Sequence, residues 1–190
     1  MIAQKTLTIR LIVIALVAAI PAWSQAAPAP HATAPGGSHQ LNALDGCMSQ
    51  WLFNGVWRVR VHQILTVVRP MTDFPGFALT VEFRNGSHKT TSLASTGVPL
   101  TGGAGSLIMD DGNPLDFYVP ENLSWSTYYV QSLPPSAGFT TVLKYFYPAK
   151  PANVGKPDKW LFEIDPSKEW QGSPKYTTTQ PSLRVRLTCG

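Results

Sequence analysis

Two pairs of arginines have a spacing that could bind an acidic ligand: Arg58 with Arg60, and Arg184 with Arg186. Within each pair the arginines alternate with apolar residues, so a β-strand would place both guanidiniums on one face. A guanidinium binds carboxylates and phosphates through a planar array of N–H donors. If the first and last strands lie in one sheet, the four arginines form one basic patch. The alternative is a solvated strand face whose charges discourage edge pairing.

The two cysteines, Cys47 and Cys189, bracket the region with strand periodicity. An even number of cysteines in an exported chain predicts a disulfide. In segment 183–189 the aliphatic residues and Cys189 share one parity, so Cys189 is expected on the buried side of a strand. Residues 44–47 also resemble a lipoprotein cleavage site, but they lie far beyond the apolar segment of the leader. The disulfide is therefore the preferred interpretation.

Motifs for catalysis are weak. Nucleophilic catalysis needs a serine or cysteine close to a histidine and an acid, and Ser106 is not followed by the glycine of a G-x-S-x-G turn. Glu163, Asp165 and Glu169 could include a glycosidase pair, although surface acids on a loop are the simpler interpretation. A hydrolase with a dispersed site is the least favoured function class, and we predict that the protein is not an enzyme.

Metal and cofactor sites are not predicted either. Residues 110–113 (DDGN) offer clustered oxygens but lack the alternating spacing of a calcium loop, so a tight turn is expected. The four histidines have no metal-ligand spacing and are expected to be solvated. They are His31, His39, His62 and His88.

Aromatic residues are abundant, with six Trp, six Tyr and eight Phe. In segment 139–147 they occur at both parities, so they cannot all face one core if the other sheet face is wet. Exposed rings would suit stacking on sugars or capture of a protein. The alternative is that loops cover them.

The first 26 residues predict export. Lys5 and Arg10 precede a short apolar segment, and small residues follow, as in a secretory signal peptide cleaved before Ala27. Residues 27–46 are expected to be a flexible Ala/Pro/Gly-rich linker, and 47–190 a single domain. Cleavage removes Lys5 and Arg10 and lowers the formal net charge from +4 to +2. Neither nucleic acid nor stable membrane insertion is expected, and the protein should be secreted or periplasmic.

From residue 51 onward the hydrophobic pattern has the period of β-strands. Apolar residues alternate with polar ones in 57–62 and 77–84, and Asn85-Gly86 ends the second run as a turn. Seven to nine short, mostly antiparallel strands predict an all-β sandwich or barrel. The other expected strands are 90–95, 107–109, 115–119, 128–131, 139–147, 160–164 and 183–189.

Segments 54–61, 81–87 and 107–112, with the Pro-rich turn before 140–148, resemble exported bacterial immunoglobulin-like domains of the mycobacterial secreted immunoprotective antigen type. The resemblance implies an immunoglobulin-like β-sandwich without an assigned activity. We therefore expect an exported, non-enzymatic binding or surface-presentation domain. Its partner would be an acidic or polysaccharide surface ligand or an acidic protein. The alternative is a carbohydrate-binding module that uses exposed aromatics.

Overall fold

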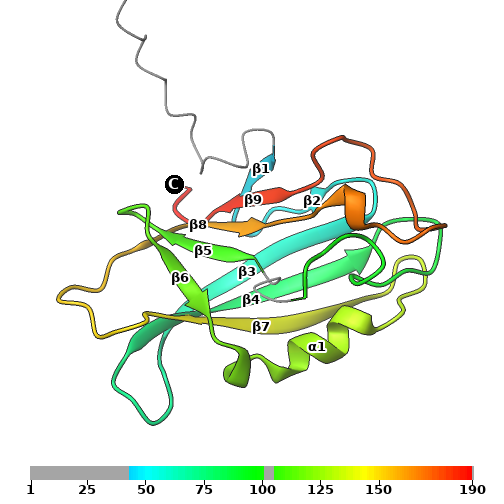
Figure 1. Cartoon of the computed structure of the whole chain (residues 1–190). Helices are drawn as coiled ribbons and strands as arrows, with labels where there is room; N and C mark the ends of the chain where they lie inside the picture. The colour runs from blue at the N-terminus through cyan, green and yellow to red at the C-terminus, as the bar shows by residue number, and fades with distance from the viewer. Residues whose placement is uncertain (1–42, 101–104, 190) are drawn as a thin grey trace, which may run out of the picture. The chain divides into compact units, whose positions relative to one another are not determined.

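The computed structural model describes residues 43–100 and 105–189 (Figure 1). These residues form nine strands, one α-helix and two short 3₁₀ helices. The strands are β1 (Leu44–Cys47), β2 (Leu52–Phe53), β3 (Trp57–Val68), β4 (Pro75–Asn85), β5 (Ser106–Met109), β6 (Pro114–Phe117), β7 (Gly138–Phe146), β8 (Pro157–Phe162) and β9 (Leu183–Arg186). The helices are η1 (Val119–Glu121), α1 (Leu123–Val130) and η2 (Pro166–Lys168).

The strands form two layers, which confirms the predicted all-β sandwich. One layer has the order β1-β9-β8-β5 and the other β7-β4-β3-β2. Strand β6 joins them, because Leu115 pairs with β5 while Asp116 and Phe117 pair with β7. Every pairing between these described strands is antiparallel except that of β1 with β9. The immunoglobulin-like connectivity stays a prediction.

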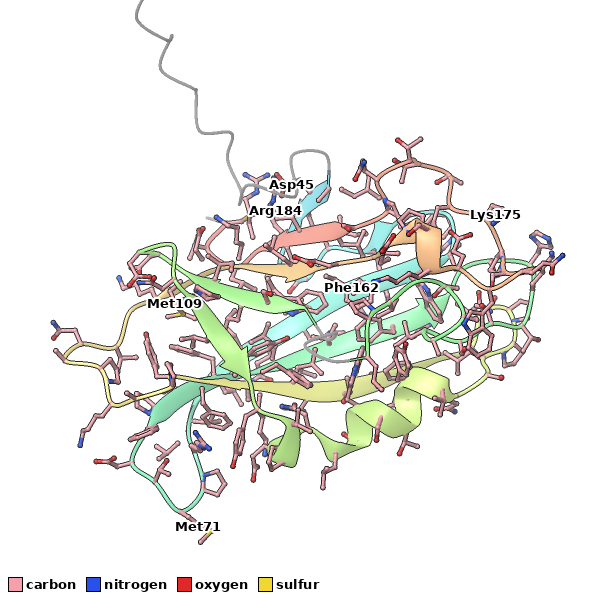
Figure 2. The ribbon with its side chains drawn as sticks, in the orientation of Figure 1. Asp45, Met71, Met109, Phe162, Lys175 and Arg184 are labelled. Carbon is pink, nitrogen blue, oxygen red and sulfur yellow. A yellow bond between two sulfur atoms is a disulfide. The ribbon has the colours of Figure 1, made fainter. Side chains whose placement is uncertain are left out.

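The core lies between the two layers, and alternation along the strands supplies it. Trp57, Val59 and Val61 of β3 are fully buried, while the residues between them face outward. Phe83 of β4 packs against Phe162 of β8, with ring centroids 5.3 Å apart (Phe162 is labelled in Figure 2). Aromatic contact across the layers fixes which face of β3 and β4 is left for solvent.

The two layers also approach each other after β1. The N–H of Met48 donates to the carbonyl of Arg186, and the next N–H, of Ser49, donates to the carbonyl of Val61 on β3. Two consecutive residues thus bridge the edge of one layer to the other. Ser49 adopts a left-handed φ of 70°, which turns the chain at this point.

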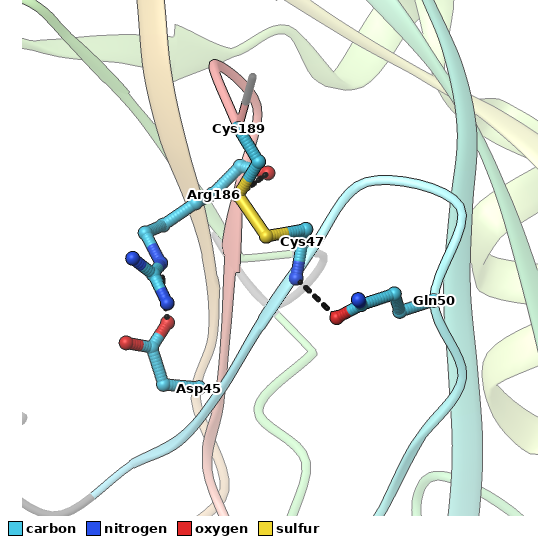
Figure 3. Close-up of a disulfide and its surroundings, with 5 residues drawn as sticks. All are labelled: Asp45, Cys47, Gln50, Arg186 and Cys189. Carbon is cyan, nitrogen blue, oxygen red and sulfur yellow. Dashed lines mark hydrogen bonds and ion pairs between the residues drawn. A yellow bond between two sulfur atoms is a disulfide. The ribbon is translucent and has the colours of Figure 1, made fainter.

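The disulfide between Cys47 and Cys189 is present, as predicted (Figure 3). It closes a loop of 142 residues and ties the end of β1 to the segment after β9. Arg186 makes an ion pair with Asp45 beside it, at 3.3 Å. The predicted orientation of Cys189 is wrong, because β9 ends at Arg186 and Cys189 is exposed. Its position on the surface follows from the bend after the strand, which breaks the parity.

Three expectations about local structure need correction. Segment 128–131 is not a strand but the end of α1, because Trp125 and Tyr129 lie four residues apart on one side of a helix and pack together. Segment 90–95 holds only an isolated bridge from Thr91 to Leu133. The last residues of the predicted linker form β1, whereas residues 1–42 lie outside the described part. No helix among the described residues is long and apolar enough to cross a bilayer.

Candidate functional site

The outer face of β3 and β4 brings three arginines together. Arg58 of β3 lies directly opposite Arg84 of β4, and Arg60 lies directly opposite Glu82. Directly opposed side chains have Cβ atoms about 5 Å apart. Arg58 makes no ion pair within the described residues, whereas Arg60 and Arg84 both bind Glu82. Two guanidiniums therefore bind one carboxylate, and a third arginine, Arg58, lies opposite Arg84.

Glu82 organises this face through three contacts. Its Oε2 accepts from Arg60 at 2.9 Å and lies 2.7 Å from His62 Nε2, while its Oε1 accepts from Arg84 at 2.7 Å. Burial alone would raise the pKa of Glu82, but these hydrogen bonds outweigh it, and the pKa falls from 4.5 to about 2. The carboxylate is thus ionised throughout the neutral range. His62 reaches it because it has the same strand parity as Arg60, next to the point where the pairing of β3 and β4 shifts between Val61 and Gln63.

Two aromatic rings hold the arginines in place. The Arg58 guanidinium lies 5.0 Å from the ring centroid of Phe53. Arg60 and Arg84 lie 4.4 and 5.5 Å from the ring centroid of Trp51. Both rings remain exposed, Trp51 at 38% and Phe53 at 43%. Stacking orients a guanidinium and leaves its N–H edges for other partners. We call the outer surface formed by Trp51, Phe53, Arg58, Arg60, Glu82 and Arg84 the arginine face.

Two hollows adjoin on the arginine face and share Arg84 and Ser136. The first, of about 200 Å³, is bounded mainly by Arg58, Arg84 and Ser136, with Asn85 and Gly86 behind them. The second, of about 410 Å³, is lined by Glu82, Arg84, Ser136, Gly138, Phe139 and Thr140. Ser136 has a left-handed φ of 67°, which a non-glycine residue adopts at a cost. Backbone strain of this kind gathers at functional sites.

Asn85 and Gly138 position the hollows. The backbone N–H of Asn85 donates to Ala137, and its carbonyl accepts from Ser136, which ties the Ser136 turn to the end of β4. The buried Asn85 side chain donates to the carbonyls of Lys89 and Leu133. Gly138 lies opposite Arg84, and a Cβ there would come within 2.3 Å of the Phe83 carbonyl oxygen and 2.7 Å of the Arg84 Cγ. A side chain at this position would therefore push against the β4 backbone and against the arginine.

The predicted four-arginine patch needs correction. Arg58 and Arg60 are on β3, whereas Arg184 and Arg186 are on β9 of the other layer. Arg184 is only 7% exposed, so its guanidinium is not an outward charge (Arg184 is labelled in Figure 2). Arg186 is exposed but paired with Asp45. The expectation failed because β9 pairs with β1 and β8, whereas β3, which carries Arg58 and Arg60, belongs to the other layer. Arg84 on β4 replaces Arg184 as the neighbour of Arg58.

The other candidate residues have structural roles or lie apart. Residues 110–113 form the expected turn between β5 and β6, where Met109 donates to the carbonyl of Asn113. Asp165 accepts from Ser167 at the start of η2, Glu169 pairs with Lys175, and Glu163 is exposed. His62 contacts Glu82 and is not simply solvated as predicted, whereas His88 is exposed. His31 and His39 lie outside the described residues. Among the residues that the structure describes, no cluster of three His, Cys, Asp or Glu could hold a metal.

Some of the aromatic rings are covered and others are exposed, so each of the two interpretations of the aromatic residues holds for part of them. Phe146 is on the outer side of β7 but buried, because the Tyr118 ring packs edge-on against it at 5.7 Å. Trp57, Trp125 and Trp160 belong to the core. Trp51 and Phe53 are exposed on the arginine face, and Trp170 is exposed elsewhere at 61%. Phe146 of β7 is thus covered, whereas the rings of Trp51, Phe53 and Trp170 are exposed.

Sequence reasoning missed Trp51 and Phe53, and it did not assign Arg84 to the site. Their signals were present, since Arg84 alternates with buried Phe83, and Trp51 and Phe53 share a parity just before β3. What the sequence lacks is the register that places them opposite Arg58. Searches among protein-family models, curated proteins and solved structures return no match for this chain.

Proposed function

We propose that this chain is an exported, non-enzymatic domain that binds an anionic ligand on the arginine face. The observation that carries the proposal is the direct opposition of Arg58 and Arg84 beside a single carboxylate. Like charges at opposed positions of an antiparallel pair are destabilising. A bound anion between them would convert this repulsion into two charge-assisted hydrogen bonds.

The chemistry of the face supports binding and not catalysis. Glu82 is the only carboxylate among the described residues of this face. Its pKa is about 2, so it is already ionised at neutral pH and cannot donate a proton. General acid catalysis requires a group whose pKa lies near the working pH. The hollows are shallow and polar, whereas enzyme pockets enclose most of a substrate.

Two features that do not involve the arginine face support the proposed export. The disulfide between Cys47 and Cys189 is typical of proteins that fold in oxidising compartments. The signal-peptide pattern of residues 1–26 agrees with this. We propose secretion or periplasmic residence after cleavage near Ala26, and surface presentation in the manner of the immunoglobulin-like domains that the chain resembles.

A second candidate is a carbohydrate-binding module that uses exposed aromatics. The observation that favours it is the presence of Trp51 and Phe53 on the same face as the arginines, with a large part of each ring exposed. Both candidates place the ligand on the same surface. They differ in whether charge or ring stacking dominates the affinity.

Retention of the exported protein on a carboxylate-bearing matrix, followed over increasing salt, tests the proposal. The wild type should elute at higher salt than a variant with Arg58→Gln and Arg84→Gln. The matched control is Arg186→Gln, an exposed arginine on the other layer, which should elute close to the wild type. Equal retention of all three proteins, or no retention at low salt, would contradict the proposed site.

A further inference from the structure

The two hollows of the arginine face differ in chemistry although they share a wall. The first is lined by two arginines, Arg58 and Arg84, around a space of about 200 Å³. That space is below the range of pockets for whole small molecules and suits one oxyanion group. Arg58 offers N–H donors that no described carboxylate occupies, so this hollow has unused capacity for an anion.

The second hollow is also lined by Arg84, but a carboxylate and two hydroxyls complete its lining. Glu82, whose oxygens are hydrogen-bond acceptors, lines it, and Thr140 and Ser136 carry exposed hydroxyls. Neither hydroxyl makes a hydrogen bond within the described part of the chain. An ionised carboxylate accepts hydrogen bonds and donates none, so it can receive hydrogen bonds from hydroxyls. The second hollow therefore favours a group rich in O–H donors.

On the basis of the proposed function, we propose that the anionic ligand is an acidic polysaccharide. One of its uronate residues occupies both hollows. Its carboxylate lies between Arg58 and Arg84, and its hydroxyls contact Glu82, Ser136 and Thr140. A uronate carries one carboxylate beside several hydroxyls on a single ring, which matches the adjoining hollows. The combined volume is in the range of a site for one sugar-sized group.

The arrangement also disfavours polymers with a charge on every unit and no hydroxyls. A polyphosphate chain that placed one phosphate at the arginines would bring the next towards Glu82, to whose carboxylate an ionised phosphate has no O–H group to donate. The exposed rings of Trp51 and Phe53, next to the first hollow, can stack on neighbouring sugar residues of the polymer. Polyglutamate offers carboxylates but no ring and no hydroxyls.

Calorimetric titration of the exported protein with four probes tests the assignment. The probes are oligogalacturonate, its methyl ester, polyglutamate and polyphosphate, the anions matched in charge per chain. We expect oligogalacturonate to bind at least about tenfold tighter than polyglutamate or polyphosphate, equivalent to about 1.4 kcal/mol. Esterification should abolish measurable binding, because it removes the charge and keeps the sugar ring.

Thr140→Val separates the sugar contact from the charge contact, since valine keeps the shape and removes the hydroxyl. It should weaken oligogalacturonate binding about fivefold, as expected for one hydrogen bond, and leave polyglutamate binding unchanged. The control is Thr66→Val, on an exposed part of β3 away from the hollows. Equal affinity for all three anions would overturn the sugar assignment and leave the anion site standing. Absence of binding to every anion would overturn the proposed function itself.

Discussion

Arg58 and Arg84 are opposed across β3 and β4, and only Arg84 has a carboxylate partner, Glu82 at 2.7 Å. This is an unfavourable arrangement for a strand pair, since favourable cross-strand pairs join opposite charges or apolar groups. Stacking on Phe53 and Trp51 holds the two side chains in place. The face thus keeps two cations close together at some cost to stability, and an anionic ligand would relieve that cost.

The repulsion between Arg58 and Arg84 can be measured with a double-mutant cycle of Arg58→Gln and Arg84→Gln in urea unfolding. We expect an unfavourable coupling of about 0.2–1 kcal/mol at low salt, the range for like charges at opposed positions. Because both groups are solvent-accessible, the coupling should shrink in 1 M salt. A favourable coupling at low salt would contradict the described geometry.

Acid stability should depend on Glu82. Its pKa is lowered from 4.5 to about 2 in the folded protein. The ionised carboxylate therefore stabilises the folded state fully above about pH 4.5, and this contribution is lost as the pH falls towards 2. Glu82→Gln should lower the free energy of unfolding by about 2 kcal/mol at pH 7, the value for hydrogen bonds to a charged group. The difference from wild type should narrow between pH 4.5 and 2. Glu163→Gln, at an exposed position, is the control, and a difference that persists at pH 2 would count against the role of Glu82.

Loss of the disulfide should destabilise the fold and keep its strands. In the chain-entropy view, a loop of 142 residues contributes about 5 kcal/mol through the unfolded state. Cys189→Ser should therefore lower the thermal midpoint while the circular dichroism of the native state stays that of a β-protein. Intact mass with and without reductant, after thiol alkylation, reports the bond in the wild type. Two alkylated thiols in the protein purified without reductant would contradict the disulfide.

Ser136→Gly should raise stability and weaken binding. Ser136 has φ 67°, and glycine removes a left-handed strain of about 1 kcal/mol, partly offset by the greater freedom of glycine in the unfolded chain. Met71→Gly is a matched control, because Met71 has φ 60° at the exposed tip of the β3–β4 hairpin (Figure 2). Both variants should melt higher than the wild type, and only Ser136→Gly should lose affinity for acidic ligands. Equal affinity of the two variants would remove Ser136 from the site.

Patterns within single segments predicted the sandwich well. The alternation of Trp57, Val59 and Val61 with outward residues needs no knowledge of the partner strands, and the structure follows it. The two cysteines likewise predicted their own pairing.

Asn85 and Asn122 each begin an Asn-x-Ser triplet, the pattern of a glycosylation site. In the structure both side chains are buried and donate hydrogen bonds to backbone carbonyls of neighbouring segments.

Relations between distant segments could not be predicted in the same way. The alternation around Arg184 predicted an outward side chain, yet the residue is buried in the folded chain. Arg84 and Arg58 come together only through the register of β3 with β4, which alternation alone does not define. Segment 123–130 is rich in residues that favour strands, but packing of Trp125 against Phe83 selects a helix.

The central claim, that the arginine face binds anions between Arg58 and Arg84, is tested most directly by nuclear magnetic resonance of arginine side chains. The Nε–H resonances of the purified protein would be followed during titration with oligogalacturonate. We predict that Arg58 and Arg84 shift together along one saturation curve, while Arg186 on β9 does not move. Saturable shifts confined to Arg186 or to other segments, with Arg58 and Arg84 unchanged, would contradict the claim.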